Sequence, residues 1–469
     1  MNWLLIWIIA YLLLIVLISL RHVRSMDMEQ YMVNNRNTST IPLIATTLAT
    51  FVGGGTSIGL MALGYESGFA AVGIGLAYVI GFFIMSKYAG KIRDFGAKNK
   101  IYSFPHYLNF IYNPGNSKNY SRTFSMTVSG VNIFIFFFML AAQFVAMASI
   151  LKFSFELEHN TATVISALIV IVYTAIAGLS GVIITDLIQF IAIIIMIVLI
   201  FIPGVWIDTN HLQRLGELPI EFLTGTHYGY TFLIGLLVFL SWSVLVRMDI
   251  WQRILAAKDA KTARKVSIIS GLGMLPFYII FPLVGMAIKL TVSDINSPKD
   301  VAYIFISRHS QGFLLAFAVV GMLSALMSSS DSFLNIISIS AVKDFWNNKQ
   351  KITKQGFWIR IATLLFGIIA MLIALSFPHI VDLMVLGLST ISIFVPITLF
   401  ALIDKNAKYY SKIALYSIIA GFVVNVAFFI FGLLNPEKFQ AKSSFVPGFI
   451  VATIVLLIGI VFSKKHDLN

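Results

Sequence analysis

Long apolar runs separated by short polar segments dominate the pattern of the chain. A helix needs about 20 apolar residues to cross a bilayer core, so a window of roughly 19 residues identifies candidate membrane spans. This pattern predicts thirteen spans. They cover residues 2–20, 42–64, 69–86, 125–151, 161–178, 181–205, 229–250, 266–288, 311–341, 357–376, 382–403, 413–434 and 446–463.

Composition agrees with a membrane protein, because 58% of the 469 residues are hydrophobic and only 11% are charged. The chain has no cysteine, which excludes a disulfide framework, a thiolate metal site and a cysteine nucleophile. No set of base, nucleophile and oxyanion donors is recognisable either, so we expect no enzyme activity.

The lysines and arginines predict the orientation of the chain. With the N-terminus outside and thirteen crossings, 25 of the 33 fall in segments that then face the cytoplasm. The first run lacks a basic leader and a small-residue cleavage site, so we expect it to be retained as a helix. The net charge of +13 then reflects orientation and contact with anionic lipid, and nucleic acid is not an expected partner. The short tails favour a bacterial inner membrane, with the C-terminus in the cytoplasm.

Three consecutive glycines, followed by two hydroxyl residues, interrupt the apolar run at "ATFVGGGTSIGL", residues 49–60. Unpaired backbone groups are costly in lipid, so helix-breaking residues survive there only where they line a cavity or meet a ligand. Glycines also let a neighbouring helix or a solute approach the backbone closely. The stretch therefore indicates a packing seam or a binding site. A phosphate loop is excluded because no lysine follows the glycines.

A stripe of small residues lies in "GMLSALMSSSDSFLNIISIS", where Ala325, Ser328, Ser329 and Ser332 share one helical face. One interpretation is a seam for close helix packing. The other is a cation site, because hydroxyl and carbonyl oxygens suit alkali and alkaline-earth ions. In that case a broken helix at residues 49–55 supplies the missing carbonyls and points the N–H groups of its second half at a solute.

Several motifs resemble the sodium:solute symporter family, which includes bacterial sodium-coupled galactose, proline and sialic acid transporters. The motifs, in order, are "ATFVGGGTSIGLMALGYESG", "YSFPHYLNFIYN", "GVIITDLIQ", "DIWQRILAAKDAKTARK" and "ALMSSSDSFLN...AVKDFW". The resemblance implies an all-α polytopic fold with a 5+5 inverted repeat whose first and sixth core helices are broken. It divides the chain into an extra helix and linker (1–40), two five-helix repeats (41–228 and 229–403) and two further helices (404–469).

The same resemblance implies a principal sodium site. Its ligands are the carbonyl oxygens of Ala49, Val52 and Ala325 and the hydroxyls of Ser328 and Ser329. The helical stripe points to the last three residues independently of the resemblance.

Some family members have a second sodium site, which maps onto Asp186, Ser328, Asp331 and Ser332. Asp331 departs from the serine of the sialic acid transporter and adds a charge that could strengthen the site or take up a proton. For Asp186, a structural ion pair or a hydrogen-bonded gate is the alternative. One or two sodium ions are therefore expected.

Four residues are candidates for solute binding: Gly53, Thr56, Trp242 and Arg247. Thr56 occupies the family position whose side chain reaches the solute, and Trp242 either covers a ligand or fills core. Arg247 either grips a carboxylate bidentately, reaches the cytoplasmic face, or pairs with an acidic side chain. The second core helix has no polar group near Gly75, which makes a sugar less favourable.

These features predict a secondary transporter that couples inward sodium movement to uptake of a small carboxylate-bearing solute, such as an amino acid or an organic acid. A sodium-coupled sugar or polyol symporter is the alternative. A transporter-like sensor or an uncoupled channel is an alternative of a different class, and flux through a channel would be insensitive to sodium.

Overall fold

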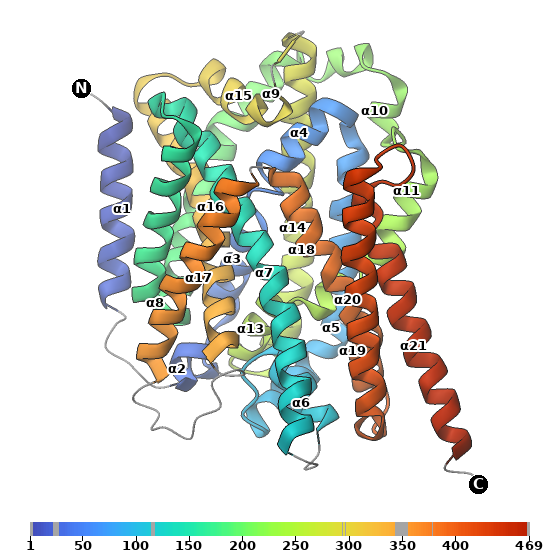
Figure 1. Cartoon of the computed structure of the whole chain (residues 1–469). Coiled ribbons are helices and arrows are strands. Elements are labelled where there is room, and N and C mark those ends of the chain that lie inside the picture. The colour runs from blue at the N-terminus through green and yellow to red at the C-terminus, as the bar shows by residue number, and fades with distance from the viewer. Residues whose placement is uncertain are drawn as a thin grey trace.

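The computed structural model describes residues 3–21, 28–113, 118–292, 294–295, 297–342, 355–377 and 379–466. Residues 343–354, which lie between the predicted spans 311–341 and 357–376, are outside this description. Within them the chain is a bundle of helices without a strand, and most helices run along one common direction (Figure 1). An all-α polytopic fold is confirmed.

The α-helices have the following bounds: α1 (Trp3–Arg21), α2 (Met28–Val33), α3 (Thr40–Phe51), α4 (Ile58–Ser67), α5 (Val72–Lys98), α6 (Phe104–Tyr112), α7 (Lys118–Phe155), α8 (His159–Met196), α9 (Ile202–Asp208), α10 (Ile220–Thr224), α11 (Gly229–Gly235), α12 (Ser243–Val246), α13 (Met248–Ala256), α14 (Ala260–Thr291), α15 (Val301–His309), α16 (Gly312–Ser340), α17 (Gln355–Ser376), α18 (Ile380–Ile391), α19 (Val395–Ile403), α20 (Ser411–Leu434) and α21 (Phe445–His466). Short π-helical segments, η3 (Ile197–Phe201) and η5 (Leu236–Leu240), continue α8 and α11.

The predicted count of thirteen spans is not confirmed. Among the described residues, eleven helical runs are long and apolar enough to cross a membrane, and a bent pair of helices would make twelve. The difference lies at the first core helix, because α3 is too short to qualify and residues 58–98 form one continuous apolar run. A count based on apolar length cannot separate helices that meet at a break.

Burial divides the bundle into centre and edge. Every residue from 318 to 340 of α16 is buried, which is the pattern of a helix enclosed on all sides. In contrast, α1 and α21 lie at opposite edges of the bundle (Figure 1) and expose large apolar side chains such as Leu17 and Phe462. Such an edge is suited to lipid.

Both predicted helix breaks are present. The first separates α3 from α4 at residues 52–57, and the second bends the chain by 49° between α12 and α13 at Arg247. Thr38, just before α3, forms a parallel bridge with Ala257, just after α13. The outer ends of the two broken helices are therefore tied to each other.

The next helix, α14, starts at an aspartate cap and packs closely on α4. The Thr262 N–H donates to Asp259 at 2.6 Å, and this hydrogen bond lowers the pKa of Asp259. A Cβ added at Gly285 would lie 2.1 Å from the Met61 carbonyl oxygen. The glycine therefore allows the backbones of α14 and α4 to touch, which holds the half-helix α4 in place.

Candidate functional site

The three glycines of the first break have different surroundings. A Cβ at Gly53 would lie 2.2 Å from the Ser329 Oγ, and one at Gly54 would lie 2.8 Å from the Ala146 Cβ. The Gly54 N–H donates to Gln143 Oε1 on α7 at 2.7 Å. Gly53 and Gly55 also line a cavity. The break is thus both a packing seam and the wall of a cavity, and the two interpretations of its glycines are compatible.

The small-residue stripe of α16 faces the end of α3. Ser329 donates its hydroxyl proton to the Thr50 carbonyl at 2.7 Å, and Ser328 donates to Asp186 Oδ1 at 2.5 Å. Each hydroxyl oxygen therefore keeps lone pairs available to accept a cation. The predicted sodium ligands Ala49, Val52 and Ala325 are completely buried beside these serines.

The residues at the predicted principal site have the types of ligand atom that a sodium ion requires. The stripe offers hydroxyl oxygens and the broken end of α3 offers carbonyl oxygens, which are hard ligands. Backbone bonds of the break use the carbonyls of Leu48, Ala49, Gly53 and Gly54 as acceptors, and the Val52 carbonyl is not one of these. An ion there would connect α3 to α16.

The second predicted set of ligands is only partly brought together. Asp186 on α8 accepts from Ser328 and from Thr46, and Ser332 lies 3.2 Å from Thr50. Asp331 instead accepts from the Tyr173 hydroxyl at 3.1 Å. A buried arginine, Arg253 of α13, contacts both Asp186 and Ser332. Asp186 therefore takes part in a buried ion pair, as its alternative role describes.

The second break carries a buried ion pair. Arg247 has extended backbone angles between α12 and α13, and its Nε and Nη2 donate to the two carboxylate oxygens of Asp249 at 3.0 and 2.5 Å. Its guanidinium carbon lies 4.0 Å from the centre of the Phe51 ring. The prediction that Arg247 reaches the cytoplasmic face is wrong, because the residue is only 4% exposed. Its pairing with an acidic side chain is confirmed.

A side chain near the second break provides a hydrogen bond for a backbone carbonyl that the break leaves without its helical partner. The Trp251 indole N–H donates to the Leu245 carbonyl at 2.7 Å. A continuous helix would have given this carbonyl an amide partner four residues later. The indole therefore replaces a hydrogen bond that the break removes, and it does so without a ligand.

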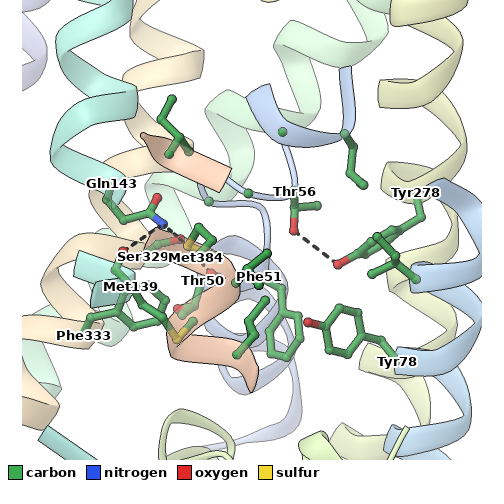
Figure 2. A pocket seen from close by; sticks show the side chains of 18 of the residues that line it. Thr50, Phe51, Thr56, Tyr78, Met139, Gln143, Tyr278, Ser329, Phe333 and Met384 are labelled. Atoms are coloured by element: carbon green, nitrogen blue, oxygen red, sulfur yellow. Dashed lines mark hydrogen bonds between the residues drawn. The ribbon is translucent and has the colours of Figure 1, made fainter. Parts of the chain in front are cut away.

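A cavity of about 130 Å³ lies where the two breaks meet. Thr50 and Phe51 line it from α3, Tyr78 from α5, Gln143 from α7, Tyr278 from α14, Ser329 and Phe333 from α16 and Met384 from α18, as Figure 2 shows. Most of the remaining lining is aliphatic. The cavity therefore offers a largely apolar space with polar groups at a few points, as small-molecule sites do.

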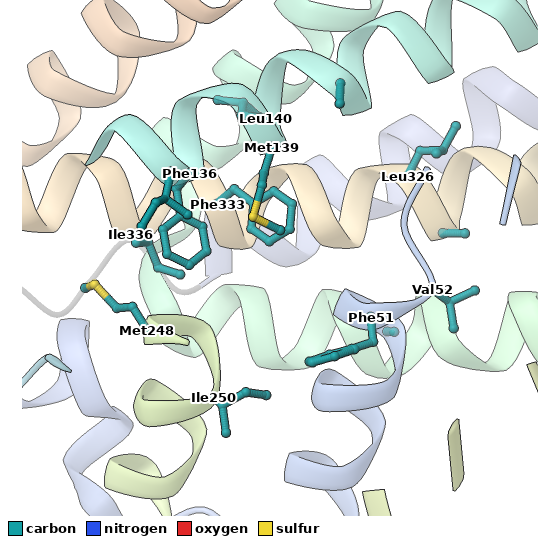
Figure 3. Close-up of a cluster of buried hydrophobic side chains, with 14 of the residues drawn as sticks. Phe51, Val52, Phe136, Met139, Leu140, Met248, Ile250, Leu326, Phe333 and Ile336 are labelled. Atoms are coloured by element: carbon teal, nitrogen blue, oxygen red, sulfur yellow. The ribbon is translucent and has the colours of Figure 1, made fainter. Parts of the chain in front are cut away.

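An apolar cluster continues from the cavity toward the C-terminal end of α16. It consists of Phe136, Phe333, Ile336, Met248 and Ile250, which come from α7, α16 and α13 (Figure 3). The rings of Phe136 and Phe333 lie 5.4 Å apart. Phe333 belongs to both the cavity lining and the cluster, so the cavity wall is continuous with this part of the core.

Three of the four predicted solute-binding residues line the cavity: Gly53, Thr56 and Arg247. Trp242 does not. It lies just before α12, partly buried against the hydrophobic core, so the alternative that it fills core describes its position.

Gln143 and the two tyrosines of the cavity were not predicted from the sequence. Tyr278 lies 3.2 Å from the Thr56 hydroxyl, and its ring fills the space above Gly75, where a Cβ would come within 2.5 Å of the Tyr278 Cβ. The absence of a side chain at Gly75 is thus matched by an aromatic side chain from α14. Gln143, a polar residue within an apolar run, was a signal that could have been used.

A family model described as the sodium:solute symporter family matches residues 31–421. A sodium/proline symporter of Staphylococcus aureus is 24% identical over 98% of this chain and 93% of its own length. A high-affinity choline transporter of Drosophila melanogaster is 26% identical over 60% of this chain, which spans only 48% of that protein.

The fold is also similar to solved structures. A substrate-bound, sodium-coupled sialic acid symporter superposes with a TM-score of 0.77 at 17% identity, over 98% of this chain and 97% of the other. A nucleobase-cation-symport-1 family transporter superposes with a TM-score of 0.54 at 15% identity, over 94% and 96%. At these identities the comparison concerns the fold.

Proposed function

Because the chain belongs to the sodium:solute symporter family, and is therefore a secondary transporter rather than an enzyme, we propose that it couples inward sodium movement to uptake of a small carboxylate-bearing solute. The solute binds in the cavity between the two breaks. Sodium binds beside it, at the end of α3 and on the stripe of α16. Rocking of one bundle of helices alternates access to this site.

One observation carries this proposal: Ser329 belongs both to the cavity and to the predicted sodium site. It lines the cavity, and its hydroxyl contacts the Thr50 carbonyl between the predicted ligands Ala49 and Val52. Gly53 lies against the same hydroxyl. An ion that orders this corner therefore orders the cavity wall, which links ion binding to solute binding.

The size and lining of the cavity support a compact solute. A cavity of about 150 Å³ admits benzene, so about 130 Å³ suits a solute with on the order of six to eight non-hydrogen atoms. Each sugar hydroxyl left unpaired against the aliphatic lining would cost about 1–3 kcal/mol. A small amino acid or organic acid with an apolar body is favoured over a sugar or polyol.

The ion pair between Arg247 and Asp249 limits how strongly Arg247 can bind the carboxylate of a solute. Arg247 already uses Nε and Nη2 on Asp249, so a solute carboxylate meets a guanidinium whose charge is largely balanced. The start of α4, with its positive helix end, faces the same cavity through Thr56 and Gly59. We assign the carboxylate to the space between these two groups. The names of the proline and choline transporters among the relatives support small, compact solutes, and proline also bears a carboxylate.

Coupling supplies the energy for accumulation. One sodium ion moving inward releases about 2.3 kcal/mol per 100 mV of membrane potential. This corresponds to roughly fiftyfold accumulation of a neutral solute, to which the sodium gradient adds. We place the chain in a bacterial inner membrane with its N-terminus outside.

The test begins with thermal stability of the purified full-length protein in sodium and in potassium, without and with L-proline, other amino acids, organic acids, choline and sugars. A ligand that binds only the folded state raises the melting temperature. We expect a sodium-specific rise that one carboxylate compound enlarges. Uptake of that compound into proteoliposomes must then require an inward sodium gradient, and uptake that is indifferent to sodium would contradict the proposal.

A further inference from the structure

The guanidinium of Arg253 lies in a pocket of oxygen atoms at the centre of the bundle. Its Nη2 donates to Ser332 Oγ at 2.7 Å, Thr50 Oγ1 at 2.8 Å and Thr46 Oγ1 at 3.1 Å, and it lies 3.5 Å from Asp186 Oδ2. This nitrogen carries two hydrogens but has four oxygen neighbours from α3, α8 and α16. Such a surplus of oxygens resembles the shell of a bound cation.

The oxygens around Arg253 overlap with the second predicted sodium site. Asp186 and Ser332 belong to both sets, and each is at most 1% exposed. Of the other two predicted ligands, Ser328 donates to Asp186, and Asp331 accepts from Tyr173 through Oδ2 while its Oδ1 is buried without a hydrogen-bond partner. A sodium ion would have to share two ligands with a fixed positive charge. At Asp186 and Ser332 the residues present therefore do not fit a second sodium ion.

Arg253 is suited to replace an ion. A guanidinium stays protonated at all physiological pH values, and its fork reaches several acceptors at once. Its Nη1 donates to the Asp249 carbonyl at 3.2 Å, which ties the group to its own helix, α13. A buried carboxylate such as Asp186 needs a positive partner in the membrane. Arg253 supplies that partner permanently, whereas an ion would come and go.

We propose that Arg253 is the built-in cation of the second position, so that this transporter binds and carries one sodium ion instead of two. The inference rests on the proposed function, because it concerns the ion stoichiometry of the same site. It also explains why both broken helices remain joined at this point, since Arg253 connects α13 to α3 without any ion.

The experiment measures equilibrium binding of radioactive sodium to the purified full-length protein, with sodium as the only probe. Wild type should bind about one sodium ion per chain with a hyperbolic dependence on concentration. Arg253→Gln frees the oxygens of Asp186 and Ser332, so it should bind about two, with a Hill coefficient above one. The neutral double variant Asp186→Asn with Arg253→Gln should return to about one.

Arg93→Gln is the matched control, because Arg93 donates to the carbonyls of Ala257 and Lys258, away from the predicted ion ligands. It should bind about one sodium ion. Two ions bound by wild type would overturn the inference and leave the proposed function intact. An unchanged single ion in folded Arg253→Gln would also overturn it. Wild type that binds no sodium would refute the proposed function itself. If Arg253→Gln does not fold, the wild-type count still decides.

Discussion

The first break contains three consecutive glycines, whereas the second is made by Arg247 alone and contains none. At the first, the backbone is the functional group: it contacts Ser329 and Gln143 and lines the cavity. At the second, Asp249 neutralises the arginine and the Trp251 indole caps the freed carbonyl. The first break contains carbonyl oxygens that are predicted sodium ligands, and the second contains a charged side chain that is already paired.

This difference teaches that a helix break in a membrane need not be a ligand site. Each break frees backbone groups that lipid cannot satisfy. Where other side chains satisfy them, as at Arg247, the break is stable alone. Where carbonyl oxygens stay available, as at the end of α3, a cation can complete the structure.

The largest effect is expected from removing hydroxyls at the first break. Ser328→Ala with Ser329→Ala should abolish sodium stimulation of uptake, because the ion loses two of its predicted ligands. Initial uptake rates at varied sodium concentration measure this. Ser330→Ala is the control, since its hydroxyl bonds the Leu326 carbonyl of its own helix, and it should keep sodium dependence. Unchanged sodium dependence in the double variant would remove the ion site from this break.

At the second break, Arg247→Gln should unfold the protein more easily and stop uptake. Removing one partner of a buried pair costs about 3–5 kcal/mol, because Asp249 is left as an uncompensated charge. The pair Arg247→Gln with Asp249→Asn should regain most of the melting temperature but not the uptake. Recovery of uptake in the double variant would show that the pair is structural only.

Gly53→Ala tests whether the first break needs a glycine where it contacts Ser329. The added Cβ would meet Ser329 Oγ at 2.2 Å and Gln143 Oε1 at 2.8 Å, so we expect a loss of about 1–3 kcal/mol from overpacking. Sodium affinity should fall together with the melting temperature. Gly59 also lines the cavity, but a Cβ added there would lie 3.5 Å from its nearest atom. The control variant Gly59→Ala should therefore have the melting temperature of the wild type.

The smallest effect is expected at the rim of the cavity. Tyr278→Phe removes the hydroxyl that lies 3.2 Å from Thr56 Oγ1 and should cost about 1 kcal/mol of solute binding, or about a fivefold rise in KM. Sodium affinity in the absence of solute should be unchanged. An equal loss of sodium affinity would mean that the solute cavity and the predicted sodium site cannot be changed independently.

The sequence alone was sufficient for the elements and for much of the first break. Apolar run length indicates helices that cross a membrane, and consecutive glycines beside hydroxyls mark an interruption. The serine stripe of α16 could be found because residues three and four apart share one helical face. These features depend on near neighbours in the chain, so a single sequence contains them.

The partners of the buried charges were decided only by the tertiary structure. Arg253 meets Thr50, which lies about two hundred residues earlier, and Asp331 meets Tyr173 rather than Asp186. Likewise, Tyr278 of α14 fills the space above Gly75. No periodicity along the chain specifies which helix faces which at a given height. Packing of the whole bundle determines these contacts, because a buried polar atom takes whichever partner the neighbouring helices bring within reach.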